Sequence, residues 1–275
     1  MKAKDIREML DGRPLSYSSL KEFAKSPLHY VHYLTAPRKD TDAFILGDVV
    51  DVLLLTPDEY EKRFFVTPKL DMRKAKNKKI MKELVIKNEG KRWITEDVKL
   101  QADRMVASAR NNSVVQKILP HLTAFQITLR WKHKQTKLPC IGKVDAEGEI
   151  LFAELKTAIS AQPDDYSRSA FNFDYPLQLG MYATGYKFSK FKFPDPYYIV
   201  IEKTEPYAVC VFRPTEDYIK YGINLYNKLM MKFNYCLEKD LFHEGYEFNG
   251  IVGSGYHHLD LPGYAKYKLN QEEGE

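Results

Sequence analysis

The sequence predicts an α/β domain in which helices flank a central mixed β-sheet, with a helical extension at the N-terminus. Three observations support this fold class. Short segments rich in β-branched and aromatic residues lie between positions 126 and 212, and helical patterns precede, interrupt and follow them. The chain has 275 residues, of which 44% are hydrophobic, enough for a large core. No internal repeat or clear linker is visible, so we expect one domain over 1–275: mainly helical in 1–120, a sheet-containing core in 121–240, and a C-terminal extension in 241–275.

The N-terminal part should consist of successive helices. Residues 16–33 begin with serines suited to an N-cap and continue with apolar residues at helical spacing until Pro27 interrupts them. Residues 44–55 are densely apolar and predict a buried helix, after which residues 56–59 begin another helix. A further helix is expected over 99–118.

Two aspartates interrupt the apolar helix over 44–55. Asp48 and Asp51 lie about one turn apart and therefore share one side of that helix. A cap or a surface stripe accounts for Asp48 readily and for Asp51 less well. A buried carboxylate needs a partner, so Asp51 is a candidate metal ligand.

The second half of the chain alternates strands and helices. Tyr197–Lys203 and Ala208–Phe212 are separated by a Glu205-Pro206 turn, and Thr215 is the predicted N-cap of a long amphipathic helix. We expect strands over 126–132, 140–144, 150–156, 197–203 and 208–212, and helices over 174–186 and 215–237. The residues after Pro262 lose all pattern, and we expect a frayed tail there.

One group of residues on the central strands predicts chemistry. Glu154 and Lys156 stand two apart, so they project from the same face of a strand. A hairpin turning through Glu147-Gly148 can bring Asp145 beside Glu154. Two converging carboxylates are costly unless a divalent cation binds between them, and hard oxygen ligands suit Mg²⁺. With a lysine to orient water or stabilise charge, the group is typical of a metal-dependent nuclease, although these three letters also occur by chance in many chains.

Positive charge is concentrated in one segment. The net charge is +5, yet residues 69–92 contain ten Lys or Arg and three acidic residues, a surplus of seven. The stretch from Arg73 to Lys82 suits contact with nucleic-acid phosphates, and a solvated helix surface explains it equally well. The candidate phosphate contacts are Arg73, Lys74, Lys76, Lys78 and Lys79.

Composition also excludes several classes. The three cysteines are far apart and give neither a zinc nor an iron–sulfur pattern, and reduced thiols are the simplest interpretation. No apolar run is long enough to span a bilayer, and the polar N-terminus has no signal-peptide core. We therefore expect a cytoplasmic protein, in a bacterial or phage-infected cell, without membrane contact.

Beyond these letters, the order and spacing of several segments resemble the RecE-type exonuclease branch of the PD-(D/E)xK nuclease superfamily, which is related to RecB-like nuclease domains and to phage lambda exonuclease. The resemblance covers most of the chain. The segments that carry it are SYSSLKEFAKSPLHY, FILGDVVDVLLLTPDEYEKRFFV, IGKVDAEG, ELKTA, YPLQLGMYATGY, YYIVIEKTEPYAVCVF and LDLPGYAKYK.

The resemblance implies roles for particular positions. Asp145 matches the first acidic residue of the superfamily motif, and Glu154 and Lys156 match its (D/E)xK pair. Gln178 and Tyr182 match a QxxxY helix that supports the site and the DNA, although core packing is the more common role of such a tyrosine. The superfamily usually carries a histidine or an acid on the helix before the sheet, and the chain departs from the RecE-type histidine with Asp51. A carboxylate also ligates Mg²⁺, so we expect Asp51, Asp145 and Glu154 to hold Mg²⁺, with Mn²⁺ able to substitute.

The implied activity is Mg²⁺-dependent hydrolysis of double-stranded DNA ends in the 5′-to-3′ direction. It would leave single-stranded overhangs for phage-type recombination, with a single-strand annealing protein as partner and a ring-shaped homo-oligomer as assembly. Two alternatives stay open. One is a DNA-binding adaptor of the same fold without catalysis, and the other is a structure-specific or Cas4-like endonuclease. The lack of a four-cysteine cluster argues against the Cas4-like form only.

Overall fold

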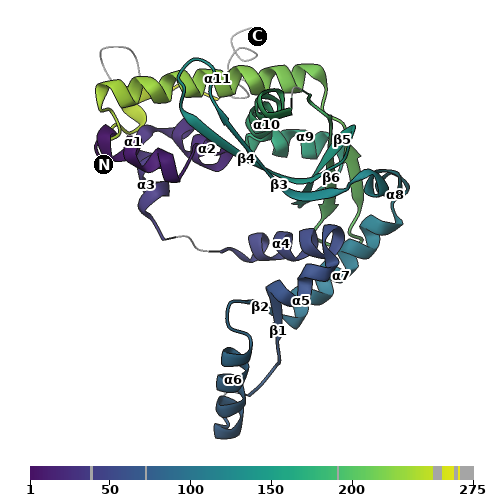
Figure 1. Cartoon of the computed structure of the whole chain (residues 1–275). Helices are drawn as coiled ribbons and strands as arrows, with labels where there is room; N and C mark the ends of the chain where they lie inside the picture. The colour runs from purple at the N-terminus through teal and green to yellow at the C-terminus, as the bar shows by residue number, and fades with distance from the viewer. Residues whose placement is uncertain (38–39, 72, 191, 250–255, 263–265, 267–275) are drawn as a thin grey trace, which may run out of the picture.

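A computed structural model describes the chain except residues 38–39, 72, 191, 250–255, 263–265 and 267–275. Among the described residues, α-helices alternate with seven strands and three short 3-10 helices (Figure 1). The α-helices are α1 Ala3–Gly12, α2 Tyr17–Lys25, α3 Pro27–Thr35, α4 Asp42–Leu55, α5 Tyr60–Arg63, α6 Ala75–Lys87, α7 Glu96–Asn111, α8 Ser113–Ile118, α9 Pro163–Asn172, α10 Tyr175–Lys190 and α11 Glu216–Lys239. The strands are β1 Phe64–Thr67, β2 Arg92–Thr95, β3 Ala124–Lys132, β4 Pro139–Glu147, β5 Leu151–Ala158, β6 Asp195–Glu202 and β7 Val209–Phe212.

The central sheet is mixed, as the sequence predicts. Its strand order is β3-β4-β5-β6-β7, and only the β5–β6 pair is parallel. A parallel pair needs a crossover connection, which α9 and α10 provide here. The sheet therefore places β5 in its centre, between an antiparallel and a parallel neighbour.

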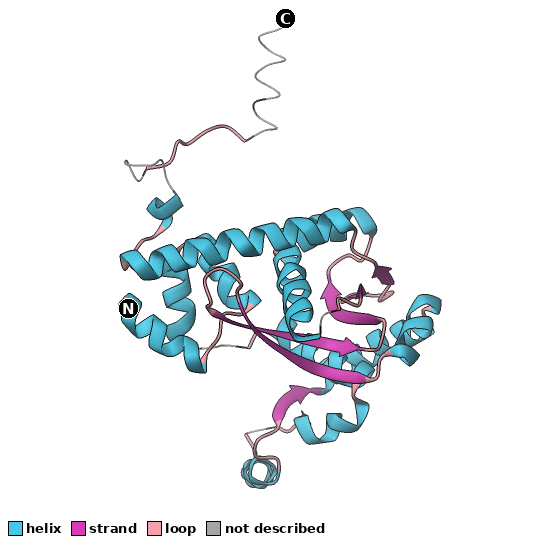
Figure 2. Cartoon of the chain, turned by 45° about the horizontal axis from the view of Figure 1, so that its top comes forward, coloured by secondary structure: helices cyan, strands magenta, loops and turns pink. Residues whose placement is uncertain are grey.

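Helices cover both faces of this sheet (Figures 1 and 2). On one face α10 packs against β3 and β4, and α11 packs across α10 and reaches α1 and α2. On the other face α4 lies against β5, and α7 lies against both α4 and β6. Each layer has its own buried hydrophobic cluster, so β4 and β5 are enclosed from both sides.

The contact between α10 and α11 depends on two glycines. A Cβ atom on Gly180 would lie 2.2 Å from the carbonyl carbon of Gly222, and one on Gly222 would lie 1.9 Å from the carbonyl oxygen of Pro176. Real Cβ atoms do not approach backbone so closely, so only glycine permits this helix separation. The close crossing holds α10 firmly over β4.

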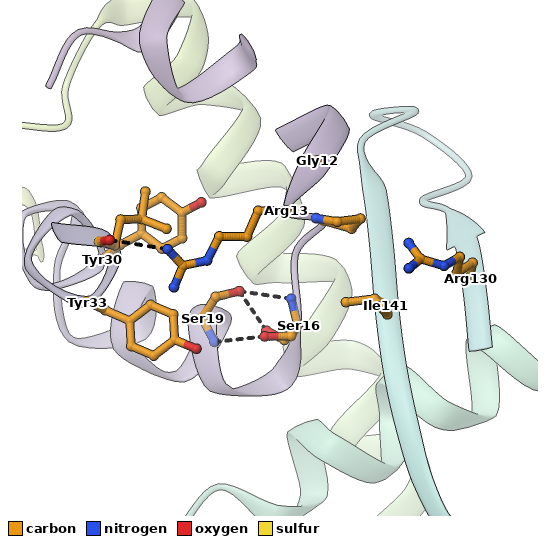
Figure 3. A pocket seen from close by; sticks show the side chains of 10 residues that line it. Gly12, Arg13, Ser16, Ser19, Tyr30, Tyr33, Arg130 and Ile141 are labelled. Atoms are coloured by element: carbon orange, nitrogen blue, oxygen red, sulfur yellow. Dashed lines mark hydrogen bonds between the residues drawn. The ribbon is translucent and has the colours of Figure 1, made fainter. Parts of the chain in front are cut away.

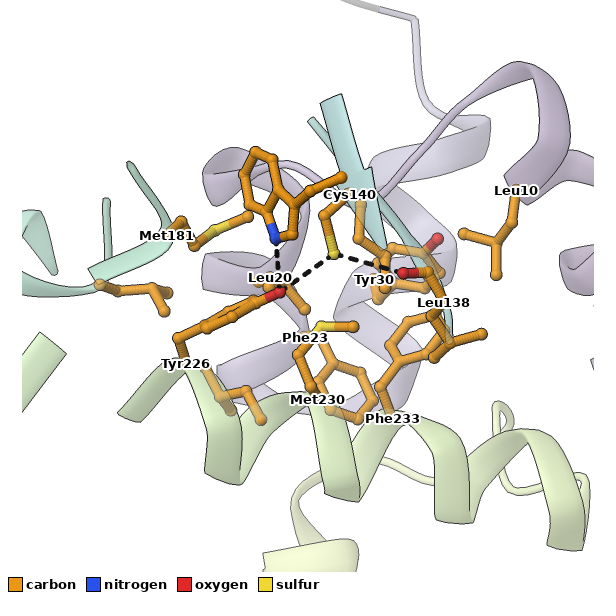
Figure 4. Close-up of a cluster of buried hydrophobic side chains, with 14 of the residues drawn as sticks. Leu10, Leu20, Phe23, Tyr30, Leu138, Cys140, Met181, Tyr226, Met230 and Phe233 are labelled. Carbon is orange, nitrogen blue, oxygen red and sulfur yellow. Dashed lines mark hydrogen bonds between the residues drawn. The ribbon is translucent and has the colours of Figure 1, made fainter. Parts of the chain in front are cut away.

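The core beneath α11 contains a small polar network (Figure 4). Trp131 Nε1 donates a hydrogen bond of 2.9 Å to the Tyr226 hydroxyl, which also lies 3.2 Å from Cys140 Sγ. Tyr226 and Cys140 are almost fully buried, and these contacts satisfy polar groups that burial would otherwise leave without partners. The network ties β3 and β4 to α11.

A small arm extends from the helical layer, on the side away from α11 (Figure 1). It contains β1 and β2, which form a two-stranded parallel sheet, and α6, in which no residue is buried. Neither strand is predictable from the sequence, because each has only four residues and lies beside a strongly basic segment.

Most elements lie where they were predicted, with shifted bounds. Pro27 separates α2 from α3, and Thr215 accepts the capping hydrogen bond from the Tyr218 N–H. The single helix expected over 99–118 is wrong: it is two helices, because the Asn112 side chain caps α8 and ends the helical run of α7. The frayed tail predicted after Pro262 lies largely outside the described residues. The predicted subdivision at positions 120 and 240 stays a prediction.

Candidate functional site

The site forms where β4 and β5 separate. These strands share only two register pairs, Ala146 with Ala153 and Glu147 with Phe152, and beyond them the ladder opens. The backbone groups left without a ladder partner are taken by acidic side chains. Glu154 Oε1 accepts from the Asp145 N–H at 3.1 Å, and Asp145 Oδ2 accepts from the Leu155 N–H at 2.9 Å. The backbone of β4 therefore orients the Glu154 side chain, and the backbone of β5 orients the Asp145 side chain.

The Glu154 carboxylate accepts hydrogen bonds from several groups of the site. Its side chain is 2% exposed, and its Oε2 atom accepts from Lys156 Nζ at 2.9 Å and from Gln178 Nε2 at 3.2 Å. Lys156 is 14% exposed, and its Nζ lies 5.1 Å from the centre of the Tyr175 ring. Strand alternation places Glu154 and Lys156 on the face that α10 covers, as the sequence predicts.

Asp51 approaches from the opposite layer. It lies in α4, its Oδ2 accepts from Gln126 Nε2 at 2.8 Å, and its Oδ1 is buried without a hydrogen-bond partner in the described structure. Asp48, one turn earlier, is held by Arg63 at 2.7 Å and by Arg92. Asp48 is thus neither a cap nor an isolated surface residue but the shared partner of two arginines, whereas Asp51 keeps one oxygen, Oδ1, without a partner among the described residues.

Burial and mutual repulsion weaken the acidity of these carboxyls. Burial raises the pKa of Asp51 to about 8, reinforced by Asp145, Asp48 and Glu154. Burial, then the Asp145 charge, raises the pKa of Glu154 to about 7 against the opposing effect of Lys156. Burial likewise raises the pKa of Asp145. Three acids with raised pKa values face one ammonium, so the site lacks positive charge when all are ionised.

The Lys156 amine keeps its proton. Burial lowers its pKa, but Glu154 and Asp145 together outweigh burial, and the resulting pKa lies well above the ordinary value for lysine. At neutral pH this side chain is therefore a cation. It can stabilise negative charge or orient water, and in this arrangement it is not poised to accept a proton.

The carboxylate oxygens of Asp51, Asp145 and Glu154 are the kind of ligand that a hard divalent cation prefers. They are not already arranged in the geometry of a bound cation. No group of three or more His, Cys, Asp or Glu side chains is arranged for metal binding in the part of the chain that the structure describes. The hydrogen bonds above turn both Glu154 oxygens and Asp145 Oδ2 toward N–H groups. Each carboxylate oxygen still has a second lone pair, and Asp51 Oδ1 is wholly free to ligate. A cation at this point would offset the excess negative charge, so the residues fit it.

A cavity of about 400 Å³ gives access to this group. Asp51, Asp145 and Lys156 line it, together with Phe44, Gln126 and Tyr175 at its sides. Glu154 and Gln178 stand behind them. The cavity therefore brings together residues from α4, β3, β4, β5 and the start of α10.

The Tyr182 side chain is buried in the core and is almost inaccessible to solvent. It is 3% exposed, its hydroxyl donates to the Lys143 carbonyl oxygen, and it accepts from Gln178 at 2.9 Å. A Cβ on Gly142 would lie 2.8 Å from its ring. This burial favours core packing and support of Gln178 over the DNA contact that the family pattern implied.

The predicted phosphate contacts stand apart from the carboxylate group. Lys76, Lys78 and Lys79 lie on α6, and Arg73 and Lys74 immediately precede it. All five are exposed, and their side chains make no ion pair with the described residues. Their role in DNA binding stays a prediction.

Several side chains of this region were not predicted from the sequence. Gln126 binds Asp51 from β3, where its backbone has a φ of 55°. Phe44 and Tyr175 form walls of the cavity. The signal for Tyr175 was its place three positions before the QxxxY pattern, whereas Gln126 and Phe44 carry no local signal. A second cavity of about 220 Å³ lies between Tyr33 and Ile141 (Figure 3), and none of the predicted site residues lines it.

Together, the opened β4–β5 ladder, the acid-x-lysine pair and the supporting glutamine define a PD-(D/E)xK-like domain. The match to known families agrees: residues 16–244 match the family described as a PDDEXK-like domain of unknown function (DUF3799), and the chain belongs to that family. No curated protein matches the sequence.

A solved structure has the same fold. It is the crystal structure of a protein named "Putative exonuclease" from Eubacterium rectale, with a TM-score of 0.59 and 12% sequence identity over 82% of each chain. At that identity the likeness concerns the fold. The family match and this neighbour place the chain in the superfamily without separating the RecE-type branch from others. No described helix is long and apolar enough to cross a membrane.

Proposed function

We propose that this protein is a metal-dependent deoxyribonuclease that hydrolyses phosphodiester bonds at double-stranded DNA ends. The observation that carries the proposal is the convergence of Asp51, Asp145 and Lys156 on one accessible cavity, with Glu154 directly behind them and hydrogen-bonded to Lys156 and to the Asp145 N–H. The PDDEXK-like family and the exonuclease-named neighbour support a nuclease.

Each residue of the site has a separate role in the proposed reaction. Asp51, Asp145 and Glu154 hold a divalent cation, Mg²⁺ or alternatively Mn²⁺. When bound, such a cation lowers the pKa of water and stabilises charge on the phosphate under attack. Lys156, a cation fixed by Glu154, faces the negative charge that develops on the phosphate oxygens. Gln178 fixes Glu154 through its Nε2 donor, and its own position is set by the Tyr182 hydroxyl.

The finer assignment follows the resemblance to RecE-type enzymes. We propose cleavage in the 5′-to-3′ direction that leaves single-stranded overhangs for recombination in a phage-type system. On the same basis we propose a ring-shaped homo-oligomer and a single-strand annealing protein as partner. Light scattering coupled to size exclusion would test the assembly, and a monomer at all concentrations would contradict it.

The activity is tested with linear duplex DNA labelled at one 5′ end, in Mg²⁺ or EDTA, beside closed circular DNA. The control variant is Glu154→Gln, which keeps an oxygen able to accept the Asp145 N–H. We expect label release from linear DNA only, dependent on Mg²⁺ and on Glu154. Cutting of closed circles would identify an endonuclease, and binding without cleavage under any divalent metal would identify an adaptor.

A further inference from the structure

A third cavity, which is basic, adjoins the candidate catalytic cavity of about 400 Å³. It has a volume of about 480 Å³ and is lined by four cationic side chains, Lys62, Arg63, Lys91 and Arg92, with Asp48 as the acidic member. Asp48 also lines the catalytic cavity, so the two cavities meet at this residue.

The arm's parallel strands create this concentration of charge. Lys62 and Arg63 end α5 just before β1, while Lys91 and Arg92 stand at the start of β2. Because β1 and β2 run parallel with Phe64 opposite Arg92, both basic pairs lie at the same end of the small sheet. Gly90, with a φ of 80°, makes the turn that brings the second pair there.

Among the four cationic side chains of this cavity, Lys91 forms no ion pair with the described residues. Asp48 accepts from both Arg63 and Arg92, Arg92 also pairs with Asp40 at 2.9 Å, and Lys62 pairs with Glu59 at 2.6 Å. The side chain of Lys91 is half-buried and makes no hydrogen bond or ion pair with the described residues. Since the one carboxylate of the cavity, Asp48, is already paired with Arg63 and Arg92, the Lys91 ammonium is suited to an anionic ligand.

An exposed aromatic ring stands at the boundary between the cavities. Phe44, in the first turn of α4, is 58% exposed, lines the catalytic cavity, and has the Arg92 guanidinium carbon 5.5 Å from its ring centre. A groove that combines cations with an exposed aromatic ring is typical of sites for single-stranded nucleic acid, in which bases stack and phosphates pair with cations.

We propose, resting on the nuclease function above, that these two cavities form a continuous track for an unpaired polynucleotide strand. A base next to the scissile phosphate stacks on Phe44, and the following phosphodiester lies against Lys91. A base within a duplex has both faces covered by its neighbours, so the stacking requires an unpaired segment. The site thus takes a strand already separated from its complement near the cleavage point.

The test measures binding of a fluorescent single-stranded oligonucleotide to the full chain in EDTA, where cleavage does not interfere. Lys91→Ala should reduce the log–log salt slope by about 0.7, the value for one lost contact to a single strand. Phe44→Ala should weaken binding about tenfold, with Phe44→Trp restoring it, because one stacked base contributes on the order of that factor. An oligonucleotide carrying 2-aminopurine should show less stacking-induced quenching with Phe44→Ala.

The matched controls are Lys220→Ala on α11 and Phe188→Ala on α10, since Phe188 is 57% exposed and neither residue lines either cavity. Both controls should bind like the wild type. If Lys91→Ala and Phe44→Ala also bind like the wild type, the track is refuted, whether or not the protein cleaves DNA. If they weaken binding while no divalent metal supports cleavage, the track stands and the nuclease proposal fails.

Discussion

Replacing Asp51 by asparagine should stabilise the metal-free protein, and increasingly so as the pH rises. Asparagine keeps the shape of the side chain and an oxygen to accept the Gln126 hydrogen bond, and it removes the charge. The pKa of Asp51 is raised, so the folded state holds this proton more tightly than the unfolded chain does. The sign is therefore fixed: the cost of the charge is absent below about pH 4 and complete above about pH 8.

The size of the effect follows from the same values. A rise from the ordinary 3.8 to about 8 corresponds to an upper limit of about 5–6 kcal/mol, at about 1.36 kcal/mol per pKa unit. Water entry and movement of the neighbouring charges relieve part of this repulsion, so we expect about 2 kcal/mol. For a protein of this size, that raises the Tm by about 4–8 °C.

Thermal unfolding of both proteins, followed from pH 5 to pH 8.5 in EDTA, measures the difference. The wild type should lose stability relative to Asp51→Asn as the pH rises. Mg²⁺ should then close or reverse the gap, because the wild type has one more ligand and binding at about 100-fold above Kd adds about 2.7 kcal/mol. If the Tm of the wild type and of Asp51→Asn changes with pH in the same way in EDTA, or if Mg²⁺ raises both Tm values equally, the ionised Asp51 carboxylate does not destabilise the site and this explanation is refuted.

Four shorter predictions concern other parts of the molecule. Lys156→Ala should abolish cleavage in the labelled-DNA assay and leave the circular dichroism spectrum unchanged; retained activity would remove Lys156 from the mechanism. Gly180→Ala should destabilise the fold in urea by more than the usual 1–3 kcal/mol of overpacking, since the added Cβ meets backbone, and a smaller loss would show that α10 and α11 separate easily. Tyr226→Phe should cost about 1–2 kcal/mol by leaving Trp131 Nε1 unpaired, and an unchanged urea midpoint would contradict this. Replacing Lys76, Lys78 and Lys79 by alanine should flatten the salt dependence of duplex binding by about 0.9 per lost contact, whereas an unchanged slope would make α6 a solvated surface.

The sequence was most informative where a period or an ordered series of segments carried the signal. Alternation placed Glu154 and Lys156 on one face of β5, and the four-residue spacing of Gln178 and Tyr182 placed both on the inner face of α10. The central sheet and its flanking helices were predictable for the same reason, because long apolar patterns are robust against a shift of one or two residues.

Contacts between distant segments could not be predicted. Gln126 meets Asp51 across 75 positions, and Asp48 meets Arg92 across 44. The β1–β2 pair was missed because two short parallel strands separated by α6 have no local signature. A single sequence does not show which distant side chains come into contact in the fold. The residues that line the cavity could therefore be identified only from the structure.

The opened ladder between β4 and β5 has a consequence for how such motifs persist in evolution. Glu154 and Asp145 replace missing strand partners, so losing either would leave a backbone N–H of the central sheet unpaired. Selection for folding alone would thus keep an oxygen acceptor, the acid or its amide, at both positions in a relative that does not cleave DNA. Lys156 satisfies no backbone group, since its amine bonds to Glu154. Among relatives of this chain, the lysine is therefore a better marker of activity than an oxygen acceptor at either acidic position, because the fold itself requires that acceptor.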